Sequence, residues 1–534
     1  MKRYIILISL FCLTALPAQN SFSLRGVFGL ATIDDQVWGQ FALRPTIDFG
    51  KIKVGLDLIL YIDQNGQLHQ EEWDFSNGSA TKNTILDKIY FVQYAAPYDS
   101  VYLRAGALPR TTLGFGILAN RYSNTFNYPQ FRKIGLTASA QTKSVNLKGF
   151  INDFKENASV IGLRASRAIP FGMQLGISFV TDRNQYRGLQ DRDYDGRPDI
   201  VDSFPENSKY WLDSDDDGLA DDHPDEHDRD GDGFPDVNDP DVIHSYWDSL
   251  GVAVGRDFSS EPFYDSIPDP NIILKNEPIN ILQNPKSISA LAIDLSIPFI
   301  QSKSVSLAIY SQMAKMIGTT VNPESGAEEA LKYGFSPLGV FNHFGIFSWQ
   351  AEYRIIPAGN FDFEYWDRAY EHTRATVSSI ENGTTSIKVT AKSDKLGEFG
   401  TMRGIFGRVD VDVNENILIG ATYQNLIGDK WNSETNAFEK QTIESFLASA
   451  ELLQPIDRLA TASAFYQQRN VPNPFQFEPT ETTIMGITIG TKISPGMVLT
   501  YSYKRSYQDK NGDGDVLDAN EVINISLLET SIGF

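Results

Sequence analysis

The sequence predicts an all-β fold: a transmembrane, antiparallel, up-and-down β-barrel of about 16–20 strands. Three observations lead to this fold class. Apolar and polar residues alternate along many short segments, and the links between these segments divide into a short and a long set. After the N-terminal segment, no stretch approaches the ~20 consecutive apolar residues that a membrane helix requires. A chain that crosses a bilayer without helices must close into a barrel, because its backbone polar groups have no water partners there.

The alternation is clearest in segments 51–62, 288–297 and 497–507. Side chains of a strand point to opposite faces in turn, so a barrel strand carries apolar residues outward and polar residues inward. The apolar faces of these segments consist of Ile52, Val54, Leu56, Leu58, Leu60 and Ile62; of Leu291, Ile293, Leu295 and Ile297; and of Met497, Leu499, Tyr501, Tyr503 and Tyr507. Aromatic residues that fit interfacial girdles are Trp38, Trp349, Tyr353, Trp366 and Tyr501.

About twenty segments qualify as strands. They start near 22, 36, 51, 85, 99, 131, 144, 158, 172, 288, 303, 338, 359, 400, 416, 442, 457, 480, 496 and 520. The links after even-numbered strands are tight, at 48–51, 97–100, 141–144, 170–172, 299–303, 357–360, 413–416, 454–457 and 494–496. The links after odd-numbered strands are often long, at 63–84, 108–130, 183–287, 317–337, 371–399, 429–441, 469–479 and 508–519, with short ones near 32–35 and 154–157.

This division by parity is typical of outer-membrane barrels, which have short periplasmic turns and longer extracellular loops. The chain also ends in an aromatic residue, Phe534. Over 22–182 and 288–534 the sequence therefore resembles the bacterial outer-membrane β-barrel class, whose last strand typically ends in Phe. The resemblance implies a porin-like barrel in the outer membrane, with both termini periplasmic and the long links extracellular. A soluble all-β protein would share the alternation but would not explain the parity.

The N-terminal residues 1–18 are predicted to be a secretory signal peptide. Lys2 and Arg3 precede an apolar stretch, and Ala18 provides a small residue at the cleavage point. The single cysteine, Cys12, lies in this segment, and Phe11 before it argues against a lipoprotein signal. Export without disulfides fits a Gram-negative envelope. The expected domains are a barrel N-terminal half at 19–182, an acidic extracellular insertion at 183–287 and a barrel C-terminal half at 288–534.

The formal charge of −22 is concentrated in this insertion. Residues 191–241 contain 20 acidic and 4 basic residues, which leaves −16 within 51 positions. Phosphate binding requires a basic face, so nucleic acid is excluded as a partner.

The acidic insertion repeats one spacing of carboxylates around a glycine. Two complete repeats place Asp at positions 1, 3, 5, 9 and 12 and Gly at position 6, and a middle repeat has Pro224 at position 12 with Asp225 next. Ca²⁺ takes six to eight oxygen ligands, and a glycine at position 6 allows the sharp turn that brings alternating carboxylates together. The predicted ligands are Asp191, Asp193, Asp195, Asp199 and Asp202; Asp213, Asp215, Asp217, Asp221 and Asp225; and Asp228, Asp230, Asp232, Asp236 and Asp239.

The prolines around these repeats exclude the flanking helices of an EF-hand. The repeats resemble thrombospondin type 3 repeats, and this resemblance implies that the Asp residues are Ca²⁺ ligands, with the carbonyls of Arg197, Leu219 and Phe234 as further candidates. The alternative is an acidic loop that only repels. A weaker metal site is predicted at Asp509, Asn511 and Asp513 with Gly514, although position 9 is Leu517, and a plain hairpin turn is an equal alternative.

No nucleophile, phosphate-loop or paired-cysteine motif is present, and we predict that the protein is not an enzyme. The link 108–130 is unusually apolar. It either folds back into the barrel, with Arg110, Arg121 and Arg132 facing lumen acids such as Asp57, or forms an extracellular cap.

The leading functional hypothesis is a passive, porin-like channel that carries the calcium-binding module. One alternative is a barrel that only anchors a calcium-dependent adhesion or binding element. A second alternative is a soluble, secreted calcium-binding β protein. The expected partners are outer-membrane lipid, calcium ions, and small solutes in the lumen or a cell-surface ligand.

Overall fold

The computed structural model describes residues 21–33, 36–129, 132–214, 216–226, 277–302, 304–381 and 385–533. The chain separates into two compact units. The first consists of Met1–Gly188 with Lys286–Phe534, and the second is Leu189–Pro285. The predicted signal peptide and Phe534 lie outside the described residues.

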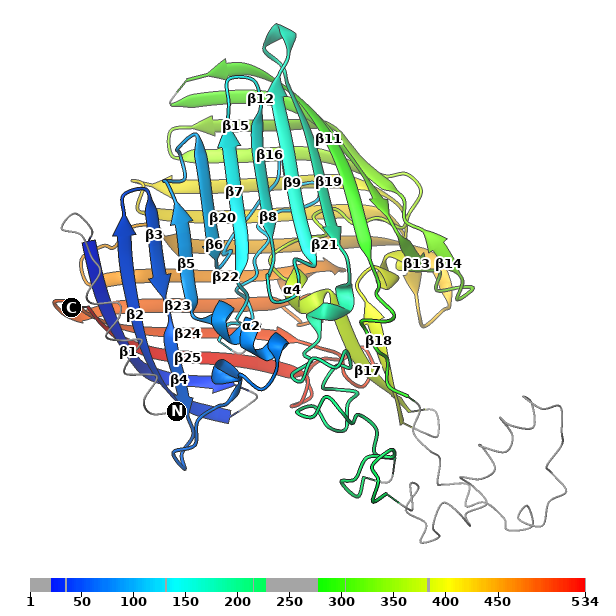
Figure 1. Cartoon of the computed structure of the whole chain (residues 1–534). Coiled ribbons are helices and arrows are strands. Elements are labelled where there is room, and N and C mark those ends of the chain that lie inside the picture. Colours follow the sequence, from blue (N-terminus) through cyan, green and yellow to red (C-terminus); the bar gives the residue numbers. More distant parts are fainter. Residues whose placement is uncertain are drawn as a thin grey trace, which may run out of the picture. The chain divides into compact units, whose positions relative to one another are not determined.

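The first unit is a closed antiparallel β-barrel. Its sheet contains 21 strand segments, and β1 pairs with both β2 and β25, with Arg25 opposite Gly533, so the sheet has no free edge (Figure 1). β3 and β4 both pair with β2 on either side of Asp57, and they therefore form one interrupted strand of a barrel of twenty. This number is at the upper end of the predicted range.

The barrel segments follow one another in chain order. They are β1 (Ser21–Ile33), β2 (Gln36–Phe49), β3 (Ile52–Leu56), β4 (Leu58–Ile62), β5 (Ile89–Tyr94), β6 (Val101–Gly106), β7 (Gly135–Gln141), β8 (Asn146–Ile151), β9 (Val160–Ala168), β10 (Gln174–Asp182), β11 (Ile288–Gln301), β12 (Val305–Ile317), β15 (Tyr333–Phe344), β16 (Phe347–Ile356), β19 (Phe399–Val413), β20 (Ile417–Asn432), β21 (Ala437–Leu452), β22 (Leu459–Val471), β23 (Ile484–Ser494), β24 (Met497–Tyr507) and β25 (Val522–Gly533).

The links contain the remaining elements. Two small hairpins pair β13 (Thr319–Val321) with β14 (Glu328–Ala330) and β17 (Ala375–Glu381) with β18 (Thr385–Ala391). The helices and 3-10 turns are α2 (Gly78–Asp87), α4 (Tyr370–Thr373), η1 (Glu71–Trp73), η2 (Pro170–Gly172), η3 (Gln185–Gly188), η5 (Asp394–Glu398) and η6 (Pro474–Gln476). No helix among the described residues is long and apolar enough to cross a membrane.

Every link at the barrel end where β1 begins and β25 ends is short. Two sequence predictions about the links are wrong. The tight turn expected at 357–360 lies instead at 345–346, between β15 and β16, so no barrel strand starts near 359. The long link expected at 429–441 is the turn 433–436, because β20 and β21 extend their pairing to Asn432 opposite Ala437.

The two faces of the barrel strands differ in polarity as the alternation predicts. On β11, Leu291 and Ile293 are each 49% exposed outward, whereas the inward Ala292 and Asp294 are buried. Comparable exposed side chains on other strands include Ile405, Ile427, Ile489 and Leu499. The barrel therefore has an apolar outer face and an interior filled with both apolar and polar side chains.

Candidate functional site

The link 107–134, which joins β6 to β7, lies inside the barrel. The Phe115 ring stacks on Tyr310 of β12 with 3.8 Å between centroids. Lys504 of β24 donates hydrogen bonds to the carbonyls of Thr125, Phe126 and Tyr128 at 2.8, 2.9 and 3.0 Å. Contacts with strands so far apart around the barrel require the link to cross the lumen, which excludes the extracellular cap.

The three arginines predicted to face lumen acids each do so. Arg132 pairs with Asp57 at 2.6 Å, in the gap between β3 and β4. Arg121 pairs with Asp410 of β19 at 2.7 Å, and Arg110 with Glu451 of β21 at 3.3 Å. Arg121 and Arg132 are mostly buried, and a buried charge is costly unless it is paired, so their two bridges hold the link against the barrel wall.

A second lumen segment, 357–374, lies where the sequence predicts a barrel strand that starts near 359. Phe361, Phe363, Tyr365 and Trp366 are all fully buried. Its backbone runs beside the first lumen segment, with the Glu364 N–H donating to the Ile117 carbonyl (2.9 Å) and the Trp366 N–H to that of Leu118 (3.1 Å). The alternation of residues near 359 therefore comes from a segment that buries one face against protein inside the lumen, and not from a barrel strand. Trp366 is not a girdle residue.

A buried ion-pair cluster attaches the end of this segment to the barrel. Arg374 lies 2.8 Å from Glu371, 2.9 Å from Glu156 and 3.4 Å from Asp182, and Lys133 also pairs with both glutamates. Burial alone would raise the pKa of Glu156, but Arg374 and Lys133 hold it well below its usual range.

The neighbouring Asp153 behaves in the opposite way, because burial raises its pKa to about 7. Its Oδ1 accepts hydrogen bonds from the backbone N–H groups of Ile134 and Lys155, both at 3.0 Å.

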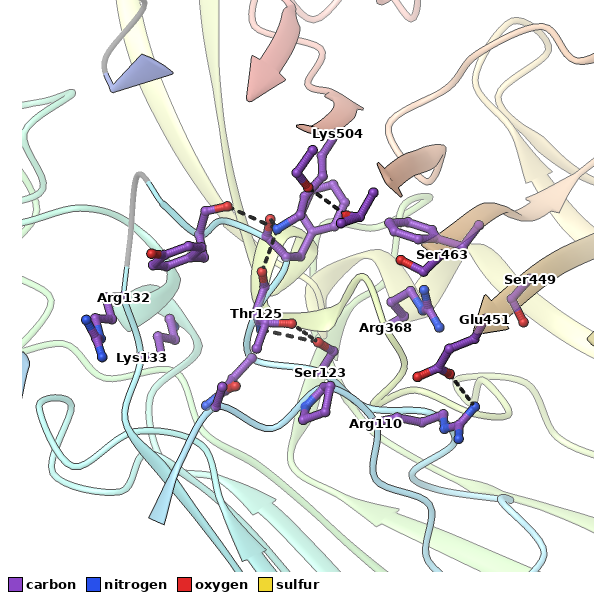
Figure 2. Close-up of a pocket in the computed structure, with 18 of the residues that line it drawn as sticks. Arg110, Ser123, Thr125, Arg132, Lys133, Arg368, Ser449, Glu451, Ser463 and Lys504 are labelled. Carbon is purple, nitrogen blue, oxygen red and sulfur yellow. Dashed lines mark hydrogen bonds and ion pairs between the residues drawn. The ribbon is translucent and has the colours of Figure 1, made fainter. Parts of the chain in front are cut away.

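A cavity of about 530 Å³ remains between the lumen segments and the barrel wall. The wall contributes side chains from β2 and from β21 to β25, and the lumen segments contribute Arg110, Ser123, Thr125 and Arg368 (Figure 2). A narrower space of about 30 Å³ lies beside Asn120, with its wall formed by β20 to β22. The lumen is thus constricted but retains a polar cavity of the size that holds small molecules.

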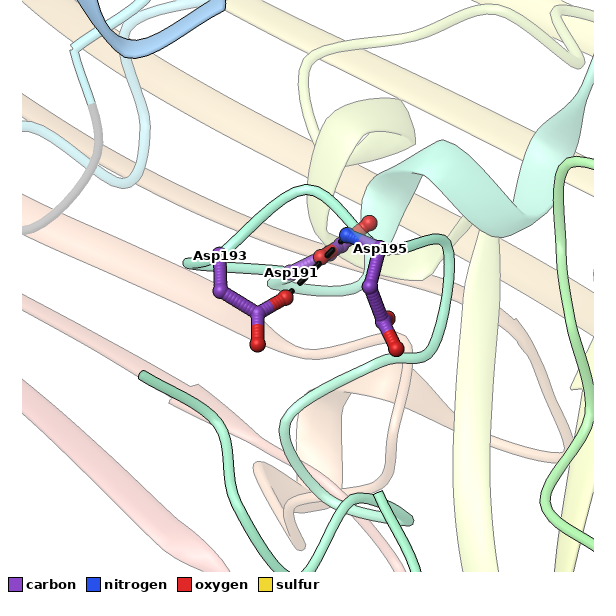
Figure 3. Close-up of side chains that lie close together, drawn as sticks. All are labelled: Asp191, Asp193 and Asp195. Carbon is purple, nitrogen blue, oxygen red and sulfur yellow. Dashed lines mark hydrogen bonds between the residues drawn. The ribbon is translucent and has the colours of Figure 1, made fainter. Parts of the chain in front are cut away.

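The acidic insertion gathers three of its predicted ligands at the first repeat. One oxygen each from Asp191, Asp193 and Asp195 lie within 4.8 Å of one another (Figure 3). Asp191 Oδ1 and Asp193 Oδ2 are buried without a hydrogen-bond partner. Burial and the charges of Asp195 and Asp193 raise the pKa of Asp191 to about 7. Arg197 pairs with Asp195 at 3.4 Å, but those two oxygens of Asp191 and Asp193 are left uncompensated, as expected where a cation supplies the missing charge.

The other two predicted ligands of this repeat lie outside that group of three. Asp199 accepts a hydrogen bond from the backbone N–H of Arg192 at 2.9 Å and pairs with its side chain. Asp202 accepts from the Phe204 N–H at 2.7 Å, and burial raises its pKa to about 6.

The middle repeat has the same local structure as the first. In each repeat, the backbone N–H at position 6 donates to the carboxylate at position 1. The distance from Gly196 N to Asp191 is 3.1 Å, and that from Gly218 N to Asp213 is 3.0 Å. The position 2 N–H donates to the position 9 carboxylate in both, and Ser214 to Asp221 measures 2.8 Å.

Both repeats also have a left-handed backbone at positions 4 and 6. The φ angles are 64° at Tyr194 and 94° at Gly196, and 61° at Asp216 and 95° at Gly218. Glycine was expected at position 6, but the left-handed residue at position 4 was not evident from the sequence.

Among the described residues, the predicted ligands of the middle repeat do not gather as those of the first repeat do. Asp217 of the middle repeat accepts from the Leu219 N–H at 2.7 Å, and the side chain of Asp225 is 84% exposed. Asp215 and the whole third repeat, Asp228, Asp230, Asp232, Asp236 and Asp239, lie outside the described residues.

The loop between β24 and β25 repeats this backbone path within the barrel unit. Gly512 and Gly514 have φ angles of 78° and 86°, and the Gly514 N–H donates to Asp509 at 3.0 Å. Asn511 and Asp513 lie at positions 3 and 5. The side-chain oxygen of Asn511 accepts a hydrogen bond from the backbone N–H of Asp513 at 2.9 Å.

The sequence allows Glu521 as a ligand here only along a different loop path from that of the repeats, and its side chain lies in this loop. Its side chain is buried, Oε1 accepts from the Lys510 N–H at 2.8 Å, and Oε2 has no hydrogen-bond partner. It follows the glycine by seven positions, whereas the repeat pattern expects its last acid six positions after the glycine, so spacing alone could not identify it.

No protein family model matches the chain, and no curated protein matches it. Among solved structures, the chain is similar to OccD3 (OpdP) from Pseudomonas aeruginosa, with 9% identity, a TM-score of 0.33 and coverage of 98% of this chain and 92% of the other. The outer membrane protein OprD of the same organism gives 8% identity and a TM-score of 0.31, with 96% and 93% coverage. OccK10 (OpdN), also from Pseudomonas aeruginosa, gives 7% identity and a TM-score of 0.33, with coverage of 96% of this chain and 99% of the other. The architecture described above rests on the strand pairing of this chain itself.

Proposed function

We propose that the protein is an outer-membrane, porin-like barrel that passes small solutes through a constricted lumen. The observation that carries the proposal is the closed barrel with an apolar outer face and a polar cavity behind it. Exposed apolar side chains such as Leu291, Ile405 and Ile427 would be unfavourable in water but suit hydrocarbon. In the proposed orientation, the barrel end that has only short turns and both chain termini faces the periplasm. The end with the long links, including 183–287, faces the outside of the cell.

We further propose that the insertion binds calcium through its repeats. The support comes from the converging oxygens of Asp191, Asp193 and Asp195 and from the identical backbone path of the two described repeats. Extracellular calcium is present at millimolar concentration, which fills even weak sites of this type. The loop at Asp509, Asn511 and Asp513 is a further calcium candidate, with Glu521 as its additional carboxylate.

One experiment tests the barrel and the insertion separately. Purified protein with and without residues 183–287 is reconstituted in planar bilayers at millimolar calcium. We expect discrete conductance steps from both proteins, because the barrel closes without the insertion. Absence of steps in both, although the protein is inserted and heat-modifiable on gels, would refute the channel.

The filled lumen favours a second candidate function, in which the barrel is only an anchor for a calcium-dependent adhesion element. Segments 107–134 and 357–374 pack together in the interior and leave only narrow spaces where the structure is described. This candidate predicts no conductance, together with calcium-dependent attachment of cells that requires 183–287.

A further inference from the structure

The cavity of about 530 Å³ in the lumen carries an excess of positive charge. Three acids line it, Asp57, Glu451 and Glu529, against six cations, Arg44, Arg110, Arg132, Lys133, Arg368 and Lys504. The cations that lack a paired carboxylate are the ones available to a solute.

Three of the cations are already neutralised by carboxylates. Arg44 lies 2.9 Å from Asp57 and 3.3 Å from Glu529, and Arg132 shares Asp57. Lys133 is held by the two buried glutamates of the ion-pair cluster. These side chains hold the lumen segments in place and have little charge left to offer.

The other three cations form a group with a single acid. Arg110 pairs with Glu451, which is about half exposed. Arg368 contacts the Phe465 ring, 4.4 Å from its centroid, and its Nε is buried without a hydrogen-bond partner. Lys504 donates only to backbone carbonyls. Among the described residues, no carboxylate oxygen lies within ion-pair distance of Arg368 or Lys504.

The electrostatic effect of this grouping is visible at Arg368. Burial and the nearby Arg110 lower the pKa of Arg368 to about 10, although Glu451 and Asp367 act in the opposite direction. A buried guanidinium beside other cations is unfavourable unless a negative charge joins it. An anion that entered the cavity would supply that charge.

The cavity wall provides hydrogen-bonding groups that suit an oxyanion. Ser449, Ser463, Thr488 and Ser502 point their hydroxyls inward from consecutive strands, and the hydroxyls of Thr488 and Ser502 lie 2.7 Å apart. Figure 2 shows Arg368 between Ser463 and Glu451, with Arg110 beside the same glutamate. A guanidinium offers paired N–H donors that match the oxygens of a carboxylate or a phosphate.

We propose that this cavity is a binding site for a small oxyanion, a carboxylate or a phosphate, held by Arg368, with Arg110 at its edge and Lys504 contributing its nearby charge rather than a hydrogen bond. The proposal deepens the channel function above and rests on it only for the route by which the anion arrives. The hydroxyls of the cavity wall orient the bound oxygens.

The test measures binding separately from conduction. Full-length protein in detergent with millimolar calcium is titrated calorimetrically with sodium succinate and with sodium phosphate at constant ionic strength. We expect saturable binding of at least one probe, weakened tenfold or more by Arg368→Gln and partly restored by Arg368→Lys. The matched control is Arg458→Gln in the exposed turn between β21 and β22, which should bind as wild type.

Stronger binding of succinate would identify a carboxylate site, and stronger binding of phosphate a phosphate site. Binding of neither probe by the wild-type protein, or equal binding by folded Arg368→Gln, would overturn the proposal. Binding without any conductance would support the proposed oxyanion site and refute the proposed channel function. Conductance without binding would support the channel function and refute the oxyanion site.

A second readout in bilayers does not depend on binding affinity. Under a potassium chloride gradient the wild-type reversal potential should indicate anion preference, and Arg368→Gln should move it toward cation preference. An unchanged reversal potential would contradict the proposal even if Arg368→Gln reduced the amount of folded protein, because each channel is recorded singly.

Discussion

The links 107–134 and 183–287 follow β6 and β10, the fifth and ninth strands of the barrel when β3 and β4 are counted as one, but they are stabilised in different ways. In the first, apolar side chains such as Leu108, Leu118 and Tyr122 are buried, and the arginines find carboxylates on the barrel wall. In the second unit, the buried apolar side chains among the described residues are Ala220 and Ile281. The first link carries its own counter-charges and core, whereas the second has a small core and few counter-charges, such as Arg192 at Asp199 and Arg197 at Asp195, beside its many carboxylates.

The largest expected effect is the loss of structure in the insertion when calcium is removed. With a small core and few counter-charges, like charges repel, and metal binding and folding become one equilibrium. Chelation should increase protease cleavage within 189–285 at least tenfold and leave 107–134 intact, as measured by limited proteolysis with mass spectrometry. Equal cleavage with and without calcium would show that the two links do not differ in this way.

Replacement of Arg374 by Met should destabilise the lumen segments by about 3–5 kcal/mol, because Asp182, Glu156 and Glu371 would lose their shared cation in a buried site. The measurement is denaturant unfolding of the calcium-saturated protein, with new protease sites expected within 357–374. Arg458→Met, in an exposed turn, should change stability by less than about 0.5 kcal/mol. A stability equal to wild type for Arg374→Met would mean that the cluster is not needed.

The lumen should also lose stability as the pH rises from about 4 to about 7. The folded pKa of Asp153 is about 7 and lies above its unfolded value, so folding favours the protonated form. This contribution is fully present below about pH 4, declines by about 1.4 kcal/mol per pH unit between the unfolded and the folded pKa, and is lost above about pH 7. Unfolding measured at pH 5, 6, 7 and 8 tests this window, with a falling stability expected up to pH 7 and a level one above it. Asp153→Asn should abolish the slope, and retention of the slope in this variant would assign it to another group.

The smallest effect is a gain in calcium affinity from Tyr194→Gly. Tyr194 has a φ of 64°, a conformation that costs a side chain about 1 kcal/mol and glycine little. Calcium binding to the full-length protein should tighten by about fivefold, as measured by calorimetry. Tyr194→Ala removes the ring but keeps the constraint on the backbone, and it should show no gain. An equal gain in both variants would trace the effect to the ring.

Most of the barrel could be predicted because the strand signal is local. Alternation and turn residues located strand starts within a few residues, as at 288 and at 497, where 496 was expected. The error at 359 has a physical cause. Phe361, Phe363 and Tyr365 alternate as in a strand, but the face that they bury lies against protein in the lumen. Alternation shows that one face is buried and does not show what covers it.

The sequence by itself determined the fold class, the positions of the turns and the spacing of the acidic repeats, because each depends on residues that are neighbours in the chain. Only the tertiary structure decided what occupies the lumen, which acids meet which arginines, and that Arg368 and Lys504 share a cavity without a carboxylate of their own. These features join residues hundreds of positions apart, as in the pair Arg121 and Asp410. They arise only when the barrel closes and brings distant strands to face one interior.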